Sequence, residues 1–205
     1  MGFYSDVILP RLCDLAMRNK DFTPLRATWV SQARGDVLEL GMGSGLNLPF
    51  YTAGVRRVRG IEPSLAMQRL ARARLRPDRT VDFLSQSADE TLPISDASID
   101  TVVSTWTLCT IPDAMGALRE MRRVLRPDGR FIFVEHGHSP DASVVGWQNR
   151  LNPVWNRIGG GCNLNRKIVD LIEGAGFRIA ELKTEYLPGP RPLTYTYQGL
   201  AERDS

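Results

Sequence analysis

The chain has 205 residues, of which 42% are hydrophobic and 24% charged, and its formal net charge is +3. This balance excludes a wholly disordered chain, and the length suits a single domain, expected over residues 1–205, with one sizeable core. No run approaches the roughly 18 apolar residues of a membrane span, and the first residues lack the apolar segment of a signal peptide. Three widely spaced cysteines without a CxxC spacing argue against a disulfide framework or a zinc knuckle, so a cytoplasmic protein is expected.

The first 34 residues precede the first predicted strand. Their apolar positions, from Val7 to Ala16, have helical spacing, and we expect residues 1–34 to form a helical cap over a ligand site. A peripheral membrane contact of this segment is the weaker alternative, because Pro10 interrupts it and no Lys/Arg-rich face stands out.

Short strand-like runs alternate with longer helical ones along the rest of the chain. The predicted strands are residues 37–40, 57–62, 80–84, 99–104, 130–135, 177–182 and 194–200. The predicted helices are residues 65–75, capped by Ser64, residues 112–125, opened by Pro112 and Asp113, and residues 166–173. This alternation predicts parallel strands with right-handed crossovers, an open, doubly wound α/β sheet.

A glycine-rich segment follows the first of these strands. Residues 39–47 read Glu-Leu-Gly-Met-Gly-Ser-Gly-Leu-Asn, and we expect a helix after them. Glycines allow a sharp turn and a close approach of backbone N–H groups to a ligand. The segment is not a Walker loop, and it departs from GxGxxG. Glu62 ends the second strand about 20 residues on, where an acid can accept both hydroxyls of a ribose.

With these residues the sequence resembles the class I S-adenosylmethionine-dependent methyltransferases. Further matches are Ser87-Ala88-Asp89, the segment 96–100 and the segment 125–130. The resemblance implies a Rossmann-like, seven-stranded sheet whose last strand is antiparallel, with S-adenosyl-L-methionine bound at the carboxyl ends of the strands and S-adenosyl-L-homocysteine as the product. Ser87 stands where the family usually has Asp, while Ala88 can still offer its backbone N–H. The cofactor contacts implied are Glu39, Gly41, Met42, Gly43, Gly45, Asn47, Glu62, Pro63, Ser87, Ala88 and Thr105.

Both histidines of the chain lie just after the fifth strand, in Glu135-His136-Gly137-His138. A thiol acceptor needs only a modest drop in pKa or a loosely placed base, and a histidine can take a proton near neutral pH. We therefore predict Glu135, His136 and His138 as the catalytic set, with His136 taking or orienting the acceptor's proton. No metal is expected, since residues two apart on a strand point in opposite directions. Cys109 and Cys162 could hold a soft ligand such as arsenite, but small buried hydrophobes are the preferred interpretation.

The second half of the chain sharpens the resemblance. Thr107-Leu108-Cys109, Glu135-His136, residues 151–155 and residues 161–164 are similar to the thiol S-methyltransferases of animals and their small bacterial relatives. The animal proteins carry an N-terminal membrane segment that this sequence does not match. Residues 136–165 are expected to build the acceptor pocket. The predicted substrate contacts are Trp106, Trp147, Trp155, Cys162 and Asn163.

The partner expected is a small-molecule methyl acceptor, most simply a thiol. A phosphatidylethanolamine (lipid amine) N-methyltransferase is the rival interpretation, and a non-catalytic cofactor-binding regulatory module is the third. An arginine cluster between Arg56 and Arg79 is interpreted as a solvated surface, so no nucleic acid is expected. A monomer and a dimer both remain open.

Overall fold

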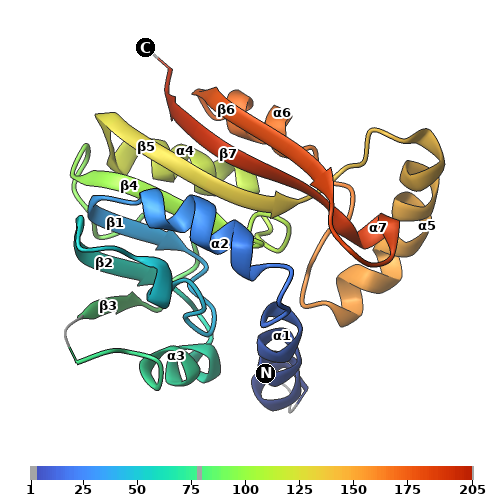
Figure 1. Ribbon diagram of the computed structural model, residues 1–205, viewed down its shortest axis with the longest axis horizontal. Helices are drawn as coiled ribbons and strands as arrows, with labels where there is room; N and C mark the ends of the chain where they lie inside the picture. The colour runs from blue at the N-terminus through green and yellow to red at the C-terminus, as the bar shows by residue number, and fades with distance from the viewer. Residues whose placement is uncertain (1–3, 78–79, 205) are drawn as a thin grey trace.

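A computed structural model describes residues 4–77 and 80–204. Its centre is a seven-stranded sheet in the order β3-β2-β1-β4-β5-β7-β6 (Figure 1). The strands are β1 (Gly35–Leu40), β2 (Val55–Ile61), β3 (Val81–Leu84), β4 (Ile99–Thr105), β5 (Leu125–His136), β6 (Phe177–Tyr186) and β7 (Tyr195–Arg203). β1 to β5 pair in parallel, and β7 runs antiparallel to both β5 and β6. The predicted doubly wound sheet with an antiparallel last strand is therefore confirmed.

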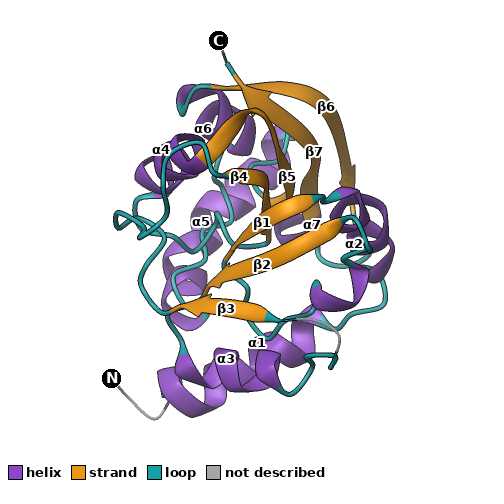
Figure 2. Cartoon of the chain, turned by 90° about the vertical axis from the view of Figure 1, so that its left-hand side faces the viewer, coloured by secondary structure: helices purple, strands orange, loops and turns teal. Residues whose placement is uncertain are grey.

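Helices cover both faces of the sheet (Figure 2). α4 (Ala114–Val124) and α6 (Ile168–Gly174) pack on one face, and α2 (Thr23–Trp29) packs on the other. Alternate side chains of β5 pack on opposite faces of the sheet. Phe131 and Phe133 lie in the hydrophobic cluster with α4 and α6, and Ile132 and Val134 lie in the cluster with α2. This period of two is what a strand buried on both faces requires.

The predicted helix starts are confirmed in atomic detail. The Ser64 hydroxyl accepts the backbone N–H of Met67 at 3.3 Å and caps α3 (Leu65–Arg72). The Asp113 carboxylate accepts the N–H of Gly116 at 2.8 Å and caps α4. β5 begins five residues earlier than expected, because Leu125 already pairs with Ile99 before the register shifts.

The expected helix after the glycine-rich segment is replaced by a single 3-10 turn at Leu48–Phe50. Tyr51 follows in an extended conformation, and its hydroxyl donates to Glu39 Oε2 at 2.6 Å. That bond returns the chain to the end of β1, so the segment closes as a compact loop. The prediction of a helix here is wrong.

The N-terminal segment is helical, as predicted. A π-helical turn at Tyr4–Ile8 leads into α1 (Leu9–Met17), which lies beside α3 (Figures 1 and 2). Asp14 on α1 accepts from Arg74 Nη2 at 2.8 Å, and Arg74 also donates to the Ser44 carbonyl. This ion pair ties α1 to the glycine-rich loop.

Two elements lie between β5 and β7 besides α6 and β6. α5 (Ala142–Ile158) occupies most of the predicted pocket segment 136–165, and the short α7 (Arg191–Thr194) precedes β7. Within the described part of the chain, no helix combines the length and apolar character needed to cross a bilayer.

Three exposed arginines of the cluster make local contacts. Arg56 contacts Asp100 at 2.8 Å, Arg57 contacts Asp82 at 2.5 Å, and the Arg72 guanidinium lies 4.2 Å from the centre of the Phe83 ring. Such pairs are the arrangement expected of ordinary surface arginines.

Candidate active site

A cavity of about 540 Å³ opens at the carboxyl ends of the central strands. Its walls come from α1, the glycine-rich loop, the β4–α4 connection, the end of α5 and the β6–β7 connection. This is the edge at which open α/β sheets bind ligands, and the volume suits a small molecule. The predicted site residues on its walls are Gly41, Met42, Gly43, Asn47, Glu62, Thr105, Trp106, His136, Trp155 and Cys162.

Glu62 and Gly43 form the part of the wall that fits a nucleoside. Glu62 Oε2 accepts the Gly43 N–H at 2.9 Å, and Oε1 accepts the Ser64 N–H at 2.8 Å. The carboxylate is buried, which raises its pKa, while these two bonds lower it. Each oxygen retains a lone pair for a ribose hydroxyl.

Gly43 has a φ of +56°, and a Cβ there would meet nothing nearer than the Gly41 carbonyl oxygen at 4.0 Å, so it would project into open space. Gly41 differs, because a Cβ on it would lie 2.3 Å from the Thr107 side chain. Gly41 is therefore needed for packing, whereas Gly43 leaves an open cradle. These residues fit the implied S-adenosyl-L-methionine.

Glu39 lies behind the cavity wall rather than on it. Only 1% of its surface is exposed, and its oxygens accept from Asn47 Nδ2 at 2.8 Å and from the Tyr51 hydroxyl at 2.6 Å. Burial raises the pKa of Glu39 to about 7, against the hydrogen bonds and Arg26, which lower it. Asn47 also donates to Thr105 Oγ1 at 2.9 Å, so Glu39 reaches the cavity through Asn47.

Four other predicted cofactor contacts lie off the lining described for this cavity. A Cβ on Gly45 would lie 2.8 Å from Leu48 Cδ1 and 3.0 Å from the Ala71 Cβ, so Gly45 serves close packing. Ala88 is buried in the core beneath α4, and Ser87 donates to Asp89. Pro63 stands between Glu62 and the helix cap.

The end of β4 turns sharply at Trp106, whose φ is +51°. Positive φ is rare for such a bulky residue and is a strained conformation that clusters at functional sites. The turn directs the N–H groups of Thr107 and Leu108 onto Glu135, at 2.9 and 3.1 Å. Glu135 is fully buried, and this burial raises its pKa to about 7. It therefore holds the β4–α4 loop in place from beneath the cavity wall.

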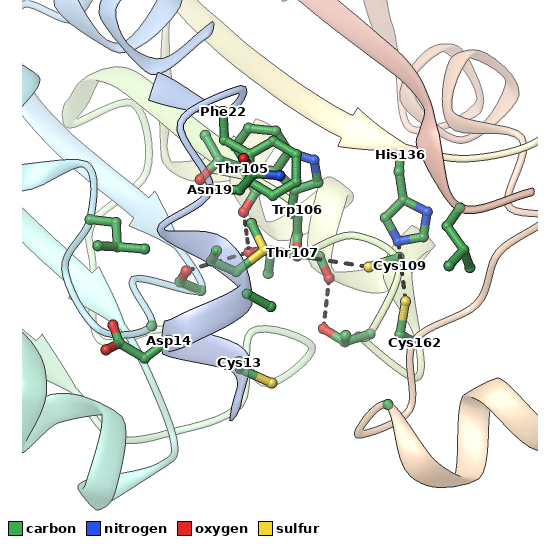
Figure 3. A pocket seen from close by; sticks show the side chains of 18 of the residues that line it. Cys13, Asp14, Asn19, Phe22, Thr105, Trp106, Thr107, Cys109, His136 and Cys162 are labelled. Atoms are coloured by element: carbon green, nitrogen blue, oxygen red, sulfur yellow. Dashed lines mark hydrogen bonds between the residues drawn. The ribbon is translucent and has the colours of Figure 1, made fainter. Parts of the chain in front are cut away.

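Three side chains from distant parts of the sequence meet on one side of the cavity (Figure 3). Cys109, His136 and Cys162 place their Sγ, imidazole nitrogen and Sγ atoms within 4.8 Å of one another, and His136 Nε2 lies 3.1 Å from Cys162 Sγ. The hydrogen bond between the two thiols raises the pKa of Cys109 and lowers that of Cys162. Burial opposes charge on His136, but the contact with Cys162 outweighs it and raises the pKa of His136.

Three other predicted residues, His138, Trp147 and Asn163, are not on the lining described for this cavity. The His138 carbonyl accepts from the Tyr197 hydroxyl, and its N–H donates to Arg166 O at 2.8 Å. Trp147 is 55% exposed on the outer side of α5. Asn163 donates from its backbone N and its Nδ2 to the Cys109 carbonyl, at 2.9 and 3.0 Å. Asn163 thus positions Cys162 beside Cys109 instead of lining the cavity.

Sequence reasoning left two parts of the wall without named residues. One is the inner face of α1 with the loop after it: a helical cap over the site was expected there, and the structure adds that Cys13, Asp14 and Phe22 face the cavity (Figure 3). The other is Cys109, interpreted as a buried hydrophobe: it is buried, but it also lines the cavity. A usable signal was present, since Cys109 follows the fourth strand as His136 follows the fifth, and parallel strands bring both to one edge.

Comparison with known proteins agrees with this geometry. A family model described as a methyltransferase domain matches residues 38–133. A human protein named thiol S-methyltransferase TMT1B is 32% identical over 173 residues, covering 82% of this chain and 70% of that protein. A phosphatidylethanolamine N-methyltransferase of Cereibacter sphaeroides is 37% identical over 137 residues, covering 65% of this chain and 66% of the other.

Among solved structures, a putative methyltransferase complexed with the Haloferax volcanii Trm112 activator superimposes with a TM-score of 0.70. It is 20% identical over 98% of this chain and 97% of that one, a likeness of fold alone. The chain spans 64–70% of the length of the curated thiol S-methyltransferases that it matches.

Proposed function

Since this chain belongs to the S-adenosylmethionine-dependent methyltransferases, we propose that it transfers the methyl group of that cofactor to the sulfur of a small, largely apolar thiol. The family uses S-adenosyl-L-methionine and implies a small-molecule acceptor. The identity of the acceptor is our inference, and it rests on one observation. The cavity that contains the Glu62 and Gly43 cradle also contains the sulfur- and imidazole-bearing trio.

In this proposal the cofactor lies on the glycine-rich loop. Glu62 accepts the ribose hydroxyls, Gly43 gives the backbone a close approach, and Asn47 and Thr105 hold the polar amino-acid part. Glu39 acts as a positioning residue, because it fixes the Asn47 amide. The bound cofactor supplies a methyl group on a sulfonium, an electrophile that needs only an aligned, electron-rich acceptor.

The acceptor occupies the part of the cavity beside His136, where Trp155 lies next to Cys162, and Leu164 also lines the cavity. Trp106 lines the cavity on the side of Phe22, whose ring centre is 4.7 Å away (Figure 3). These apolar walls favour a lipophilic acceptor and exclude water from the reacting atoms. The acceptor thiol loses its proton, and its sulfur lone pair forms a bond to the methyl carbon. The methyl–sulfonium bond breaks, and its electron pair stays on the sulfur of S-adenosyl-L-homocysteine.

His136 is the member of the predicted catalytic set that lines the cavity. It serves the reaction either by taking the thiol proton or by fixing the place where the acceptor sulfur binds. Glu135 contributes indirectly, since its bonds to Thr107 and Leu108 fix the loop that carries Cys109. His138 contributes through its backbone bond to Arg166.

Methylation of a lipid amine is the second candidate, and a specific surface feature favours it. The π-helical turn at Tyr4–Ile8, α1 and α5 expose large apolar side chains, which we call the apolar face: Tyr4, Ile8, Leu12, Leu15, Trp147, Leu151, Val154 and Ile158. The Tyr4 hydroxyl donates to the Ile158 carbonyl at 2.7 Å, so the turn that leads into α1 meets the end of α5, next to Gly159 on the cavity wall. Such a surface suits contact with a membrane, from which a lipid could enter.

Production of S-adenosyl-L-homocysteine separates these candidates. The full chain is incubated with the cofactor and either an aliphatic thiol or vesicles containing phosphatidylethanolamine. Turnover with the thiol alone supports sulfur methylation, and turnover with the vesicles alone refutes it in favour of the lipid amine. Tight cofactor binding without turnover on a panel of thiols and amines would indicate the regulatory module instead.

A further inference from the structure

We propose that Cys109, His136 and Cys162 bind one thiophilic divalent cation, with Zn²⁺ as the natural occupant, and that its fourth coordination position faces the cavity. The donor atoms come from three separate elements: the β4–α4 loop, the end of β5 and the loop after α5. They lie within 4.8 Å of one another, and all three residues line the cavity.

The donor set and its spacing match zinc chemistry. Zn²⁺ binds thiolate sulfur at about 2.3 Å and imidazole nitrogen at about 2.0–2.1 Å in a tetrahedron, so its ligand atoms lie about 3.5–3.8 Å apart. The observed group approaches that spacing, with His136 Nε2 at 3.1 Å from Cys162 Sγ. Catalytic zinc sites use three protein ligands and leave one position for water or substrate. Two thiolates and one imidazole form such a set.

The backbone around the group is fixed by bonds that serve no other visible purpose. Asn163 holds the Cys109 carbonyl through two donors, at 2.9 and 3.0 Å. Asn156 Nδ2 donates to the Gly161 carbonyl at 2.7 Å. Gly160 and Gly161, with φ of +65° and +90°, make the turn that brings Cys162 back toward β5. Outer contacts that fix the ligands are the usual support of a metal site.

Charge around the group is close to balanced. A divalent cation held by two thiolates and a neutral imidazole is neutral overall. Arg166 donates to the Leu108 carbonyl and lies near both thiols, while the buried Glu135 carboxylate lies near Cys109, His136 and Arg166 with the opposite charge. The type of donor therefore selects the fourth ligand, and a thiolate from the acceptor matches the two cysteine ligands of a thiophilic cation.

This last step rests on the proposed function. The acceptor thiol gives its proton to bulk water as its sulfur binds the cation. The metal-bound thiolate then takes the methyl group, and the neutral thioether is a weaker ligand that leaves. In this state His136 fixes the acceptor by holding the cation, so its Nε2 does not take the proton.

Metal binding is tested on the full-length chain, purified under reducing conditions and stripped with a chelator. Zn²⁺ is titrated in competition with a chromophoric chelator, and Co²⁺ is added separately for its thiolate charge-transfer absorption. We expect about one Zn²⁺ per chain with a Kd below about 1 μM, and the cobalt signal of cysteine ligation. Cys109→Ser and Cys162→Ser each weaken binding by at least about a hundredfold.

Cys13→Ser and His138→Gln are the matched controls, since Cys13 lines the same cavity and His138 is the other histidine, yet neither belongs to the group. Both keep wild-type zinc affinity. Thermal unfolding and cofactor binding confirm that every variant is folded. Should wild type bind Zn²⁺ no more tightly than the double variant Cys109→Ser/Cys162→Ser, or should the controls weaken binding equally, the proposal is overturned.

The activity assay keeps this proposal separate from the proposed function. If the chain binds zinc but methylates no thiol, the metal-site proposal stands and the proposal of a thiol acceptor is refuted. Thiol methylation that survives chelation and is unchanged in Cys109→Ser supports the acceptor and refutes the role of the metal in binding that acceptor. Loss of thiol turnover on chelation, restored by Zn²⁺, supports both.

Discussion

Replacing Glu62 by glutamine tests the cofactor cradle with minimal change of shape. The native carboxylate accepts one backbone N–H on each oxygen, from Gly43 at 2.9 Å and from Ser64 at 2.8 Å. Glutamine keeps one acceptor oxygen, but its amide group points hydrogens at the other N–H. It also removes the negative charge of the carboxylate, whose two oxygens would accept hydrogen bonds from the ribose hydroxyls.

The size of the effect follows from these contacts. A buried N–H left without a partner costs about 1–3 kcal/mol, and hydrogen bonds to a charged group contribute about 1.5–3 kcal/mol. Burial disfavours the charged form of Glu62 and raises its pKa. Removing this charge therefore offsets part of the cost of the unpaired N–H. We therefore expect a loss of stability near 1 kcal/mol and a 10- to 100-fold weaker affinity for the cofactor, about 1.4–2.8 kcal/mol.

Isothermal titration with S-adenosyl-L-homocysteine measures the affinity, and urea unfolding measures the stability. Glu181→Gln, an exposed change of the same kind on the outer strand β6, is the control and should keep both values. Wild-type affinity in a folded Glu62→Gln protein, within about threefold, would refute the placement of the ribose at Glu62.

Three further changes probe the rest of the site. Arg74→Gln removes the side chain that joins Asp14 on α1 to the Ser44 carbonyl of the glycine-rich loop. Steady-state kinetics should then show a KM for the cofactor raised about 3- to 30-fold with little change in kcat. A change in stability alone would contradict this role. Glu39 has a pKa of about 7 in the folded protein, above its ordinary 4.5, so the folded state favours the protonated carboxyl. The free energy of unfolding therefore falls as pH rises from 4.5 to about 7. Urea unfolding should show Glu39→Gln gaining about 2 kcal/mol relative to wild type between pH 5.5 and 8, and a constant difference would refute the raised pKa. Leu15→Asp/Val154→Asp on the apolar face should reduce sedimentation with vesicles and spare turnover of a water-soluble thiol; unchanged sedimentation would argue against this surface.

The positions of the predicted site residues show where sequence reasoning stops. The spacing of His136 and His138 predicted only that the two side chains point in opposite directions, and of these two histidines His136 is the one that lines the cavity. That spacing said nothing of Cys109 and Cys162, which lie 27 and 26 residues away from His136 in opposite directions. Contacts across such separations depend on the order in which strands pair, so a local pattern does not reveal them.

The glycine-rich loop shows the same limit at short range. Its glycines predicted a tight turn, and all three have positive φ. Where a helix was expected the chain makes a single 3-10 turn, and the Tyr51 hydroxyl then bonds to Glu39 on the preceding strand. The glycine pattern did not reveal this contact, which joins residues 12 apart.

The sequence by itself determined the order of the seven strands, the helix caps at Ser64 and Asp113, and the acid after the second strand, because each depends on residues close together in the chain. It did not predict α5 or α7. Only the tertiary structure decided that Glu39 contacts Asn47 behind the cavity wall, which residues of α1 line the cavity, and that two cysteines meet His136. These features depend on pairing order and on side chains packing across the carboxyl edge of the sheet. Periodicity fixes which residues are buried, and the folded sheet fixes which of them touch.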